Sequence, residues 1–147
     1  MKIYIGTDHR GIDVEKNIIS YLKNNNHEVI ESRIEHSDAD DYVDFAKDVA
    51  LNVVNNENSV GILICGTGIG MSIAANKIKG IRAARCVSVE DAYYTRLDND
   101  ANVLCLGYNS DLNTLFEIIN TFLNTSFSHA ERHTRRVNKI KEIEAEK

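Results

Sequence analysis

The sequence predicts an α/β fold in which helices cover both faces of a parallel sheet. Three observations predict it. Short β-rich or apolar runs alternate with amphipathic helical patterns along the whole chain. The run 60–65 is continuously apolar, as in a strand covered on both faces. The 147 residues contain no proline, which suits one uninterrupted domain over residues 1–147. We therefore expect a three-layer, Rossmann-like, doubly wound sheet of five parallel strands in the order 2-1-3-4-5.

The expected strands and helices alternate strictly. Strands are predicted at 2–5, 27–30, 60–65, 81–87 and 102–106, and helices at 12–22, 45–54, 71–79, 89–97 and 112–123. The segment 33–41 is charged and irregular, which predicts a loop. The charged tail from His129 onward carries a thin apolar stripe, which indicates a last helix outside the core.

Composition excludes several classes of protein. A hydrophobic share of 43% and a charged share of 27% are those of an ordinary globular domain, not of a disordered chain. The net charge of −5 argues against general nucleic-acid binding. No apolar stretch approaches the roughly 18 residues of a membrane span. The first strand turns polar by Thr7, so we expect no signal peptide and no contact with a membrane.

The cysteines indicate a reducing compartment. Cys65, Cys86 and Cys105 are an odd number, are widely spaced and form no CxxC pair, so neither a zinc ribbon nor a disulfide framework is expected. This pattern favours the cytoplasm. Cys86 and Cys105 lie inside expected strands and are predicted to be inert packing.

A glycine-rich loop follows the central strand. Gly66, Gly68 and Gly70 alternate there, so that successive N–H groups can point inward at the start of a helix, which suits an anion. Met71 stands where the dinucleotide fingerprint needs glycine, and no Gly-Lys-Ser/Thr follows as in a P-loop. A tight turn with nothing bound is the alternative interpretation. Cys65, at a position that favours thiolate, weighs against it, although inert packing stays open for this residue as well.

The loop 7–11 is expected to face the loop that follows Cys65. It puts a carboxylate, an imidazole and a guanidinium at the end of the first strand. In doubly wound sheets, ligands bind at the carboxyl ends of the strands, where the strand order reverses. Helix capping by Asp8 beside solvated side chains is the alternative.

The tail presents histidines and arginines on one helix face. Positions 129, 132, 133 and 136 are spaced to lie together, and two arginines one turn apart can bind phosphate. A solvated charged face is the alternative. Ala130 breaks the HExxH zinc motif, so we expect no metal site.

These segments resemble the ribose-5-phosphate isomerase B family, which also includes the galactose-6-phosphate isomerase subunits. The matching segments span nearly the whole chain in order and are 6–11, 41–45, 61–84, 99–103 and 132–137. The family interconverts an aldose phosphate and a ketose phosphate without a metal or cofactor. The resemblance therefore implies an isomerase of ribose 5-phosphate and ribulose 5-phosphate, with no cofactor.

The resemblance also implies roles for single residues. Cys65 is similar to the base that moves a proton from C2 to C1 through a cis-enediolate, and Thr67 assists proton transfer at the oxygens. The amides of the glycine loop act as oxyanion donors. The implied substrate-binding residues are Asp8, His9, Tyr42, Gly66, Gly68, Ile69, Gly70, Asn99, Arg132 and Arg136. Because the family's phosphate site is shared across a dimer interface, the C-terminal helix is expected to reach a partner subunit in a homodimer or homotetramer.

Two positions depart from the family pattern. Asp98 stands where the family usually has the histidine that opens the sugar ring; it is kept as a catalytic candidate, although a carboxyl group is a poorer acid–base group near pH 7. Asn109 stands where many members have an arginine. The choice between pentose and hexose phosphate therefore stays open. The alternatives are an allose or galactose 6-phosphate isomerase, or a non-catalytic sugar-phosphate-binding subunit.

Overall fold

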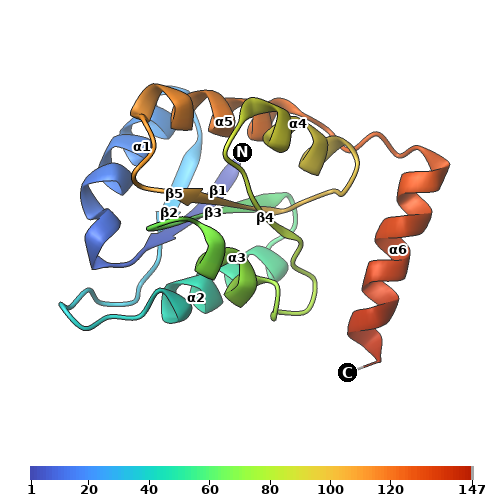
Figure 1. Ribbon diagram of the computed structural model, residues 1–147, viewed down its shortest axis with the longest axis horizontal. Helices are drawn as coiled ribbons and strands as arrows, with labels where there is room; N and C mark the ends of the chain where they lie inside the picture. Colours follow the sequence, from blue (N-terminus) through green and yellow to red (C-terminus); the bar gives the residue numbers. More distant parts are fainter. Residues whose placement is uncertain (147) are drawn as a thin grey trace.

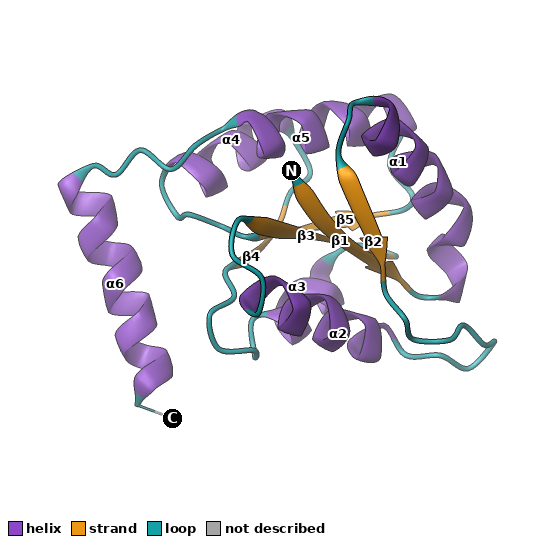
Figure 2. Ribbon diagram, turned by 180° about the vertical axis from the view of Figure 1, so that it is seen from behind, coloured by secondary structure: helices purple, strands orange, loops and turns teal. Residues whose placement is uncertain are grey.

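The computed structural model describes residues 1–146 and shows the expected layered architecture, a parallel sheet covered by helices on both faces (Figures 1 and 2). The strands are β1 (Lys2–Thr7), β2 (Glu28–Glu31), β3 (Ser59–Cys65), β4 (Ala83–Arg85) and β5 (Val103–Gly107). The helices are α1 (Ile12–Asn24), α2 (Tyr42–Val54), α3 (Ile69–Ala75), α4 (Val89–Leu97), α5 (Leu112–Asn124) and α6 (Glu131–Ala145). Within the described residues, no helix combines the length and the apolar character that crossing a bilayer requires.

The strand order is β2-β1-β3-β5-β4, so the expected order 2-1-3-4-5 is wrong in its last two places. Burial explains the exchange. The residues from Val103 to Leu106 in β5 are fully buried, whereas those of β4 are half-buried or exposed and include Arg85. A central strand of a parallel sheet must be apolar on both faces, while an edge strand tolerates charge. β4 is therefore the edge, and it is shorter than the predicted strand 81–87.

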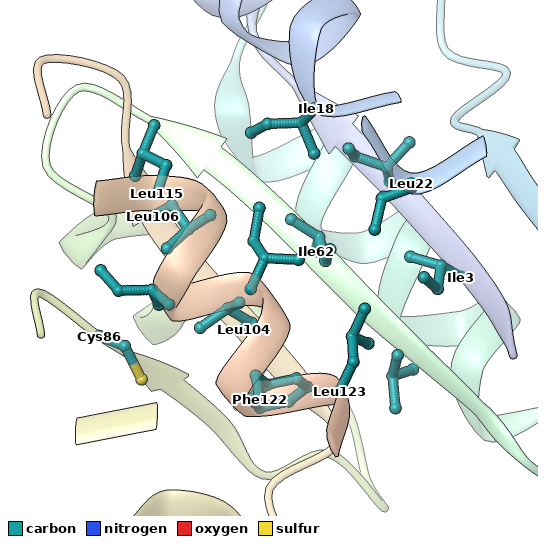
Figure 3. Packing of buried hydrophobic residues seen from close by; sticks show 14 of the residues in the cluster. Ile3, Ile18, Leu22, Ile62, Cys86, Leu104, Leu106, Leu115, Phe122 and Leu123 are labelled. Carbon is teal, nitrogen blue, oxygen red and sulfur yellow. The ribbon is translucent and has the colours of Figure 1, made fainter. Parts of the chain in front are cut away.

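The sheet separates two apolar cores. Ile18, Ile62 and Phe122 are buried between the sheet and the layer of α1, α4 and α5 (Figure 3). Phe45 and Leu63 are buried on the other face, under α2 and α3. Because side chains alternate along a strand, the neighbours Ile62 and Leu63 enter different cores. Burial of each such side chain contributes roughly 1.5–3 kcal/mol, which holds β3 in the middle of the molecule.

Helix α3 ends earlier than the pattern predicts, at Ala75 instead of 79. The Asn76 side chain donates to the Ala83 carbonyl at 2.9 Å and accepts from the Ala83 N–H at 2.8 Å. These two bonds join the helix end to the start of β4. Gly80 then turns the chain with φ of 92°, a conformation that glycine adopts without strain.

Helix α6 stands beside the β4 edge, apart from the two helical layers (Figure 1). The Ser128 N–H donates to the Leu97 carbonyl at 3.0 Å, and the Gly80 N–H donates to Glu144 Oε2 at 3.2 Å. Val137 is buried, but Ile143 of the same helix is 58% exposed. The tail is therefore helical as expected, and part of its apolar stripe is left uncovered by this chain.

One carboxyl group is buried in the first turn of α1. Among the described residues, Glu15 is the one charged residue in the buried class, at 5% exposure. Burial raises the pKa of Glu15 from 4.5 to about 7, and the nearby charge of Glu31 raises it further. The fold therefore favours the protonated, neutral form of this side chain.

We expect Glu15→Gln to remove a pH-dependent loss of stability. Because the pKa is raised in the folded state, the contribution of Glu15 is complete below pH 4.5 and is lost as the pH rises through about 7. The amide stays neutral, so the variant should match the wild type near pH 4.5 and exceed its free energy of unfolding by about 3 kcal/mol at pH 8. Urea unfolding at both pH values measures this. The control is Asp13→Asn, an exposed carboxyl on the same turn, and equal pH slopes for wild type and Glu15→Gln would contradict the expectation.

Candidate active site

The loops after β1 and β3 emerge together at the carboxyl edge of the sheet. The strands are parallel neighbours, and the Thr7 hydroxyl, fully buried, donates to the Ile64 carbonyl at 2.9 Å. A cavity of about 750 Å³ lies where the two loops meet. The predicted position of the site at this switch point, between the loop 7–11 and the loop after Cys65, agrees with this geometry.

The cavity gathers most of the residues singled out from the sequence. The predicted residues that line it are Asp8, His9, Tyr42, Cys65, Gly66, Thr67, Ile69 and Gly70. Gly68 belongs to the same loop and contacts Cys65 directly. The carboxylate of Asp8, the imidazole of His9, the thiol of Cys65 and the backbone of the glycine loop therefore lie around one cavity.

Several residues that line the cavity were not predicted from the sequence. Asp38, Asp40 and Asp41 come from the segment between β2 and α2, which the sequence indicated only as a charged loop, and Tyr108 follows β5. For Tyr108, the same rule about the carboxyl ends of strands could have found it. The inward turn of the acidic loop depends on contacts with His9, which no local pattern shows.

Cys65 is buried at the end of β3, with its sulfur against the glycine loop. The Gly68 N–H donates to Cys65 Sγ at 3.2 Å, and the Ile69 N–H donates to Thr67 Oγ1 at 3.1 Å. A donated hydrogen bond stabilises a thiolate more than a thiol. Within residues 1–146, the amides of Gly66, Thr67 and Gly70 have no protein acceptor, so they remain able to bind an oxyanion.

The other two cysteines differ from Cys65. Burial, followed by the charge of Asp91, raises the pKa of the Cys86 thiol to about 12. Burial likewise raises the pKa of Cys105, which is fully enclosed in β5. Both therefore remain protonated thiols, in keeping with the packing role predicted for them.

Glycine is required at two positions of the loop. Gly68 has φ of 81°, and a Cβ there would lie 3.1 Å from the backbone of Leu106. A Cβ at Gly70 would lie 2.6 Å from Cζ of Tyr42, so the absent side chain lets the tyrosine ring lie against the loop. The backbone can therefore pass close to both neighbours where the loop lines the cavity.

Four predicted site residues lie away from this cavity and its glycine loop. Asp98 and Asn99 belong to the connection from α4 to β5, which must lie at the amino edge of a parallel sheet, opposite the cavity. Asp98 Oδ1 is 3.3 Å from His133 Nε2, and Asn99 lines a separate groove of about 440 Å³ beside α6. Arg132 and Arg136 are on α6, away from Cys65. A single chain thus holds two separate groups of candidate residues.

The structure also limits where a metal ion could bind. In the described part of the chain, no group of three or more histidine, cysteine, aspartate or glutamate side chains is placed to hold one. His133 of α6 has Asp98 beside it. The other histidine of the HxxxH spacing, His129, precedes the helix and has φ of 58°, so the expectation that it shares a helix face with His133 is wrong.

We expect Gly68→Ala to lower the free energy of unfolding by about 2 kcal/mol or more. The left-handed conformation costs an L-residue roughly 1–2 kcal/mol, and the new Cβ would crowd the backbone of Leu106. Urea unfolding of the variant measures the loss. Gly66→Ala is the matched control, because its Cβ would meet only the Tyr108 hydroxyl at 3.6 Å, an ordinary contact. Equal stability of the two variants would refute the requirement for glycine at Gly68.

Comparison with known proteins gives a consistent result. The profile of the Ribose/Galactose Isomerase family matches residues 3–140. Ribose-5-phosphate isomerase B of Mycobacterium tuberculosis is 37% identical over 148 aligned positions, covering 98% of this chain and 90% of that protein. The structure of ribose-5-phosphate isomerase B from Clostridium thermocellum superimposes with a TM-score of 0.93 at 44% identity, covering 99% of each chain.

A further structure was determined with a sugar phosphate. Ribose-5-phosphate isomerase B of Mycoplasma genitalium, with bound ribulose 5-phosphate, superimposes with a TM-score of 0.92 at 40% identity. It covers 99% of this chain and 97% of that one. The family profile and these relatives match nearly the whole length of this chain, including the segments that line the cavity, and the two structures share its fold. The chain therefore belongs to the ribose/galactose isomerase family.

Proposed function

We infer that this protein is an aldose–ketose isomerase that interconverts ribose 5-phosphate and ribulose 5-phosphate. The observation that carries this inference is the sulfur of Cys65, which accepts the Gly68 N–H at 3.2 Å inside a cavity shared with Asp8 and His9. A sugar-binding subunit without activity would have no use for a thiol that accepts a backbone N–H in that place. The bound ribulose 5-phosphate of the Mycoplasma genitalium relative supports the choice of substrate.

The proposed reaction is a proton transfer between neighbouring carbons. The Cys65 thiolate takes the C2 proton of the open-chain aldose, and the electrons form a cis-enediolate. The free amides of Gly66, Thr67 and Gly70 stabilise the negative oxygen, and the Thr67 hydroxyl exchanges protons with the substrate oxygens. The thiol then returns a proton to C1. Substrate and product are isomers, so the step needs no external oxidant or reductant.

The charges of the cavity support a second subunit in the site. Asp8, Asp38, Asp40 and Asp41 line it, against the guanidinium of Arg10 and the imidazole of His9. A phosphate dianion is repelled by such a surplus of carboxylates. The guanidinium group of arginine binds phosphate well, and α6 carries Arg132 and Arg136 one turn apart. We therefore place Arg132 and Arg136 of one subunit at the cavity of the next.

Exposed apolar side chains offer the contact for such a dimer. Ile73 of α3, next to the cavity, is 59% exposed, and Ile143 of α6 is 58% exposed. Burial of both against a second copy would remove apolar surface from water. The same pairing brings Asp98 and Asn99 to the partner's cavity. There the Asp98–His133 pair supplies the imidazole that the family usually has at the place of Asp98, and Asn99 binds sugar hydroxyls.

The cysteines also bear on where the enzyme works. Cys65, Cys86 and Cys105 are all free and buried. Free thiols persist in a reducing compartment. We therefore place the activity in the cytoplasm.

We expect Cys65→Ala to lower kcat for ribose 5-phosphate by about 100- to 10,000-fold, the usual contribution of general-base catalysis, because the variant has no other thiol in the cavity. Binding of the sugar phosphate should stay within about threefold of the wild type. Steady-state kinetics and calorimetric titration measure the two quantities.

The control for this variant is Cys86→Ala, which removes a thiol that stays protonated outside the cavity and should keep kcat. Full activity of Cys65→Ala would reject the thiolate as base. Faster turnover of allose or galactose 6-phosphate by the wild type would replace the pentose with a hexose phosphate. Tight binding without any isomerisation would leave a non-catalytic subunit.

A mixing experiment tests the shared site. Cys65→Ala lacks the base, and the double variant Arg132→Ala/Arg136→Ala lacks the phosphate-binding arginines. In a mixed dimer, one site carries both defects and the other carries neither. Random mixing should therefore restore about a quarter of wild-type activity at low substrate concentration, since half of the dimers are mixed and each has one intact site.

Native mass spectrometry confirms that mixed dimers have formed before activity is measured. Each variant mixed with itself is the control and should remain inactive at that substrate concentration. Mixed dimers without recovered activity would mean that each site is built within one chain.

A further inference from the structure

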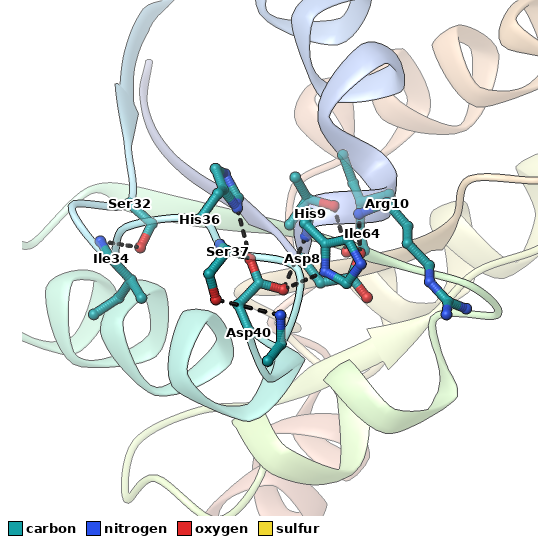
Figure 4. Close-up of polar contacts among 11 residues, drawn as sticks. Asp8, His9, Arg10, Ser32, Ile34, His36, Ser37, Asp40 and Ile64 are labelled. Carbon is teal, nitrogen blue, oxygen red and sulfur yellow. Dashed lines mark hydrogen bonds and ion pairs between the residues drawn. The ribbon is translucent and has the colours of Figure 1, made fainter.

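Asp40 joins the loop after β1 to the loop before α2 (Figure 4). Its Oδ1 accepts the His9 backbone N–H at 3.1 Å and lies 2.7 Å from His9 Nδ1. Its Oδ2 accepts the Ser37 N–H at 3.3 Å and lies 3.0 Å from His36 Nδ1. We call these residues, His9, His36, Ser37 and Asp40, the Asp40 cluster. Each carboxylate oxygen has two partners, so the group is held from both sides.

The carboxyl group of Asp40 is ionised although it is enclosed, with 6% of its side chain exposed. Burial alone would raise its pKa, but the hydrogen bonds from His9, His36 and the Ser37 N–H outweigh that effect and hold the pKa well below its usual range. An ionised carboxylate can only accept hydrogen bonds. The Nδ1 atoms of both histidines therefore carry protons.

This arrangement determines which nitrogen of His9 is available to a ligand. His9 lines the cavity, and its Nδ1 proton is engaged by Asp40. Within residues 1–146, Nε2 has no protein partner. A neutral ring can then accept a hydroxyl proton at Nε2, and a protonated ring can donate to a phosphate oxygen from the same atom.

The other side of the cluster is fixed to the core. The His36 ring stacks on Phe45, with 4.8 Å between ring centroids and 17° between planes. Phe45 is 1% exposed and belongs to the core under α2. Asp40 is thus held through His36 by a rigid element, although it lies in a loop.

We propose that Asp40 is a positioning residue for substrate binding, which orients the His9 ring and keeps its Nε2 toward the phosphate end of the substrate. The proposal rests on the proposed function. Two effects of Asp40 on an anionic substrate have opposite signs. Its negative charge repels phosphate, whereas its hydrogen bond orients the donor that binds phosphate.

The test is the kinetics of Asp40→Asn, a variant of the same shape without the charge. A charge-assisted hydrogen bond is about twice as strong as a neutral one, so KM for ribose 5-phosphate should rise about tenfold while kcat stays within about twofold. Asp38→Asn removes an equal charge from the same cavity and should lower KM by up to about threefold. A fall of KM in Asp40→Asn, or an equal rise in both variants, would overturn the proposal.

Coupling to His9 separates positioning from a general structural role. In a His9→Asn background, adding Asp40→Asn should change KM less than about twofold, because there is no longer a ring to orient. A second tenfold rise would mean that Asp40 acts on the loop and not on His9. Thermal unfolding of each variant verifies that it is folded.

A spectroscopic measurement tests the cluster without any activity. The nitrogen NMR shifts of His9, assigned by comparison with His9→Asn, should place the proton on Nδ1 in the wild type and lose that preference in Asp40→Asn. Identical spectra in the two proteins would reject the positioning role. If the wild type isomerises no sugar phosphate, the proposed function fails, and these spectra still decide whether Asp40 orients the ring.

Discussion

The direction of the strands is the constraint on which the rest of this molecule depends. β1, β3 and β5 are parallel neighbours, so the segments that follow them meet at one edge, and the segments that precede them meet at the other. The first edge receives Asp8, His9 and Cys65. The second receives Asp98 and Asn99. No adjustment of side chains within one chain can join the two groups, because the length of the sheet lies between them.

The two groups of candidate residues also differ in charge and in chemical type. The cavity combines aspartates with backbone amides, which suits the hydroxyls and the reacting oxygens of a sugar. Helix α6 carries the arginines, which suit a phosphate. A protein that kept both on one surface would neutralise its own carboxylates with its own arginines. Their placement at opposite edges of the sheet keeps the two groups apart within one chain.

Much of this could be predicted from the sequence, and the errors have physical causes. Periodicity located the helices and strands, and the glycine loop with Cys65 indicated the site. The order of β4 and β5 was mistaken because 2-1-3-4-5 is a common order for such sheets. The charged Arg85 in the expected strand 81–87 suits an edge strand better than a central one, and the buried residues of β5 suit the centre. Asp40 could not be found, since its role arises from its contact with His9, which is distant in the chain, whereas His36 is its close neighbour in the same loop. The position of Asp98 at the opposite edge, by contrast, follows from strand direction alone.

The two outer strands have a consequence for how copies of this chain can meet. β2 ends in the exposed glutamates Glu28 and Glu31, and β4 has only three residues, with α6 standing beside it. Short or charged borders are poor templates for a strand from another chain. Growth of the sheet from one molecule into the next, the route to fibrils, is thereby discouraged during synthesis, when many partly folded copies are close together. Contacts between finished molecules are left to helices and loops.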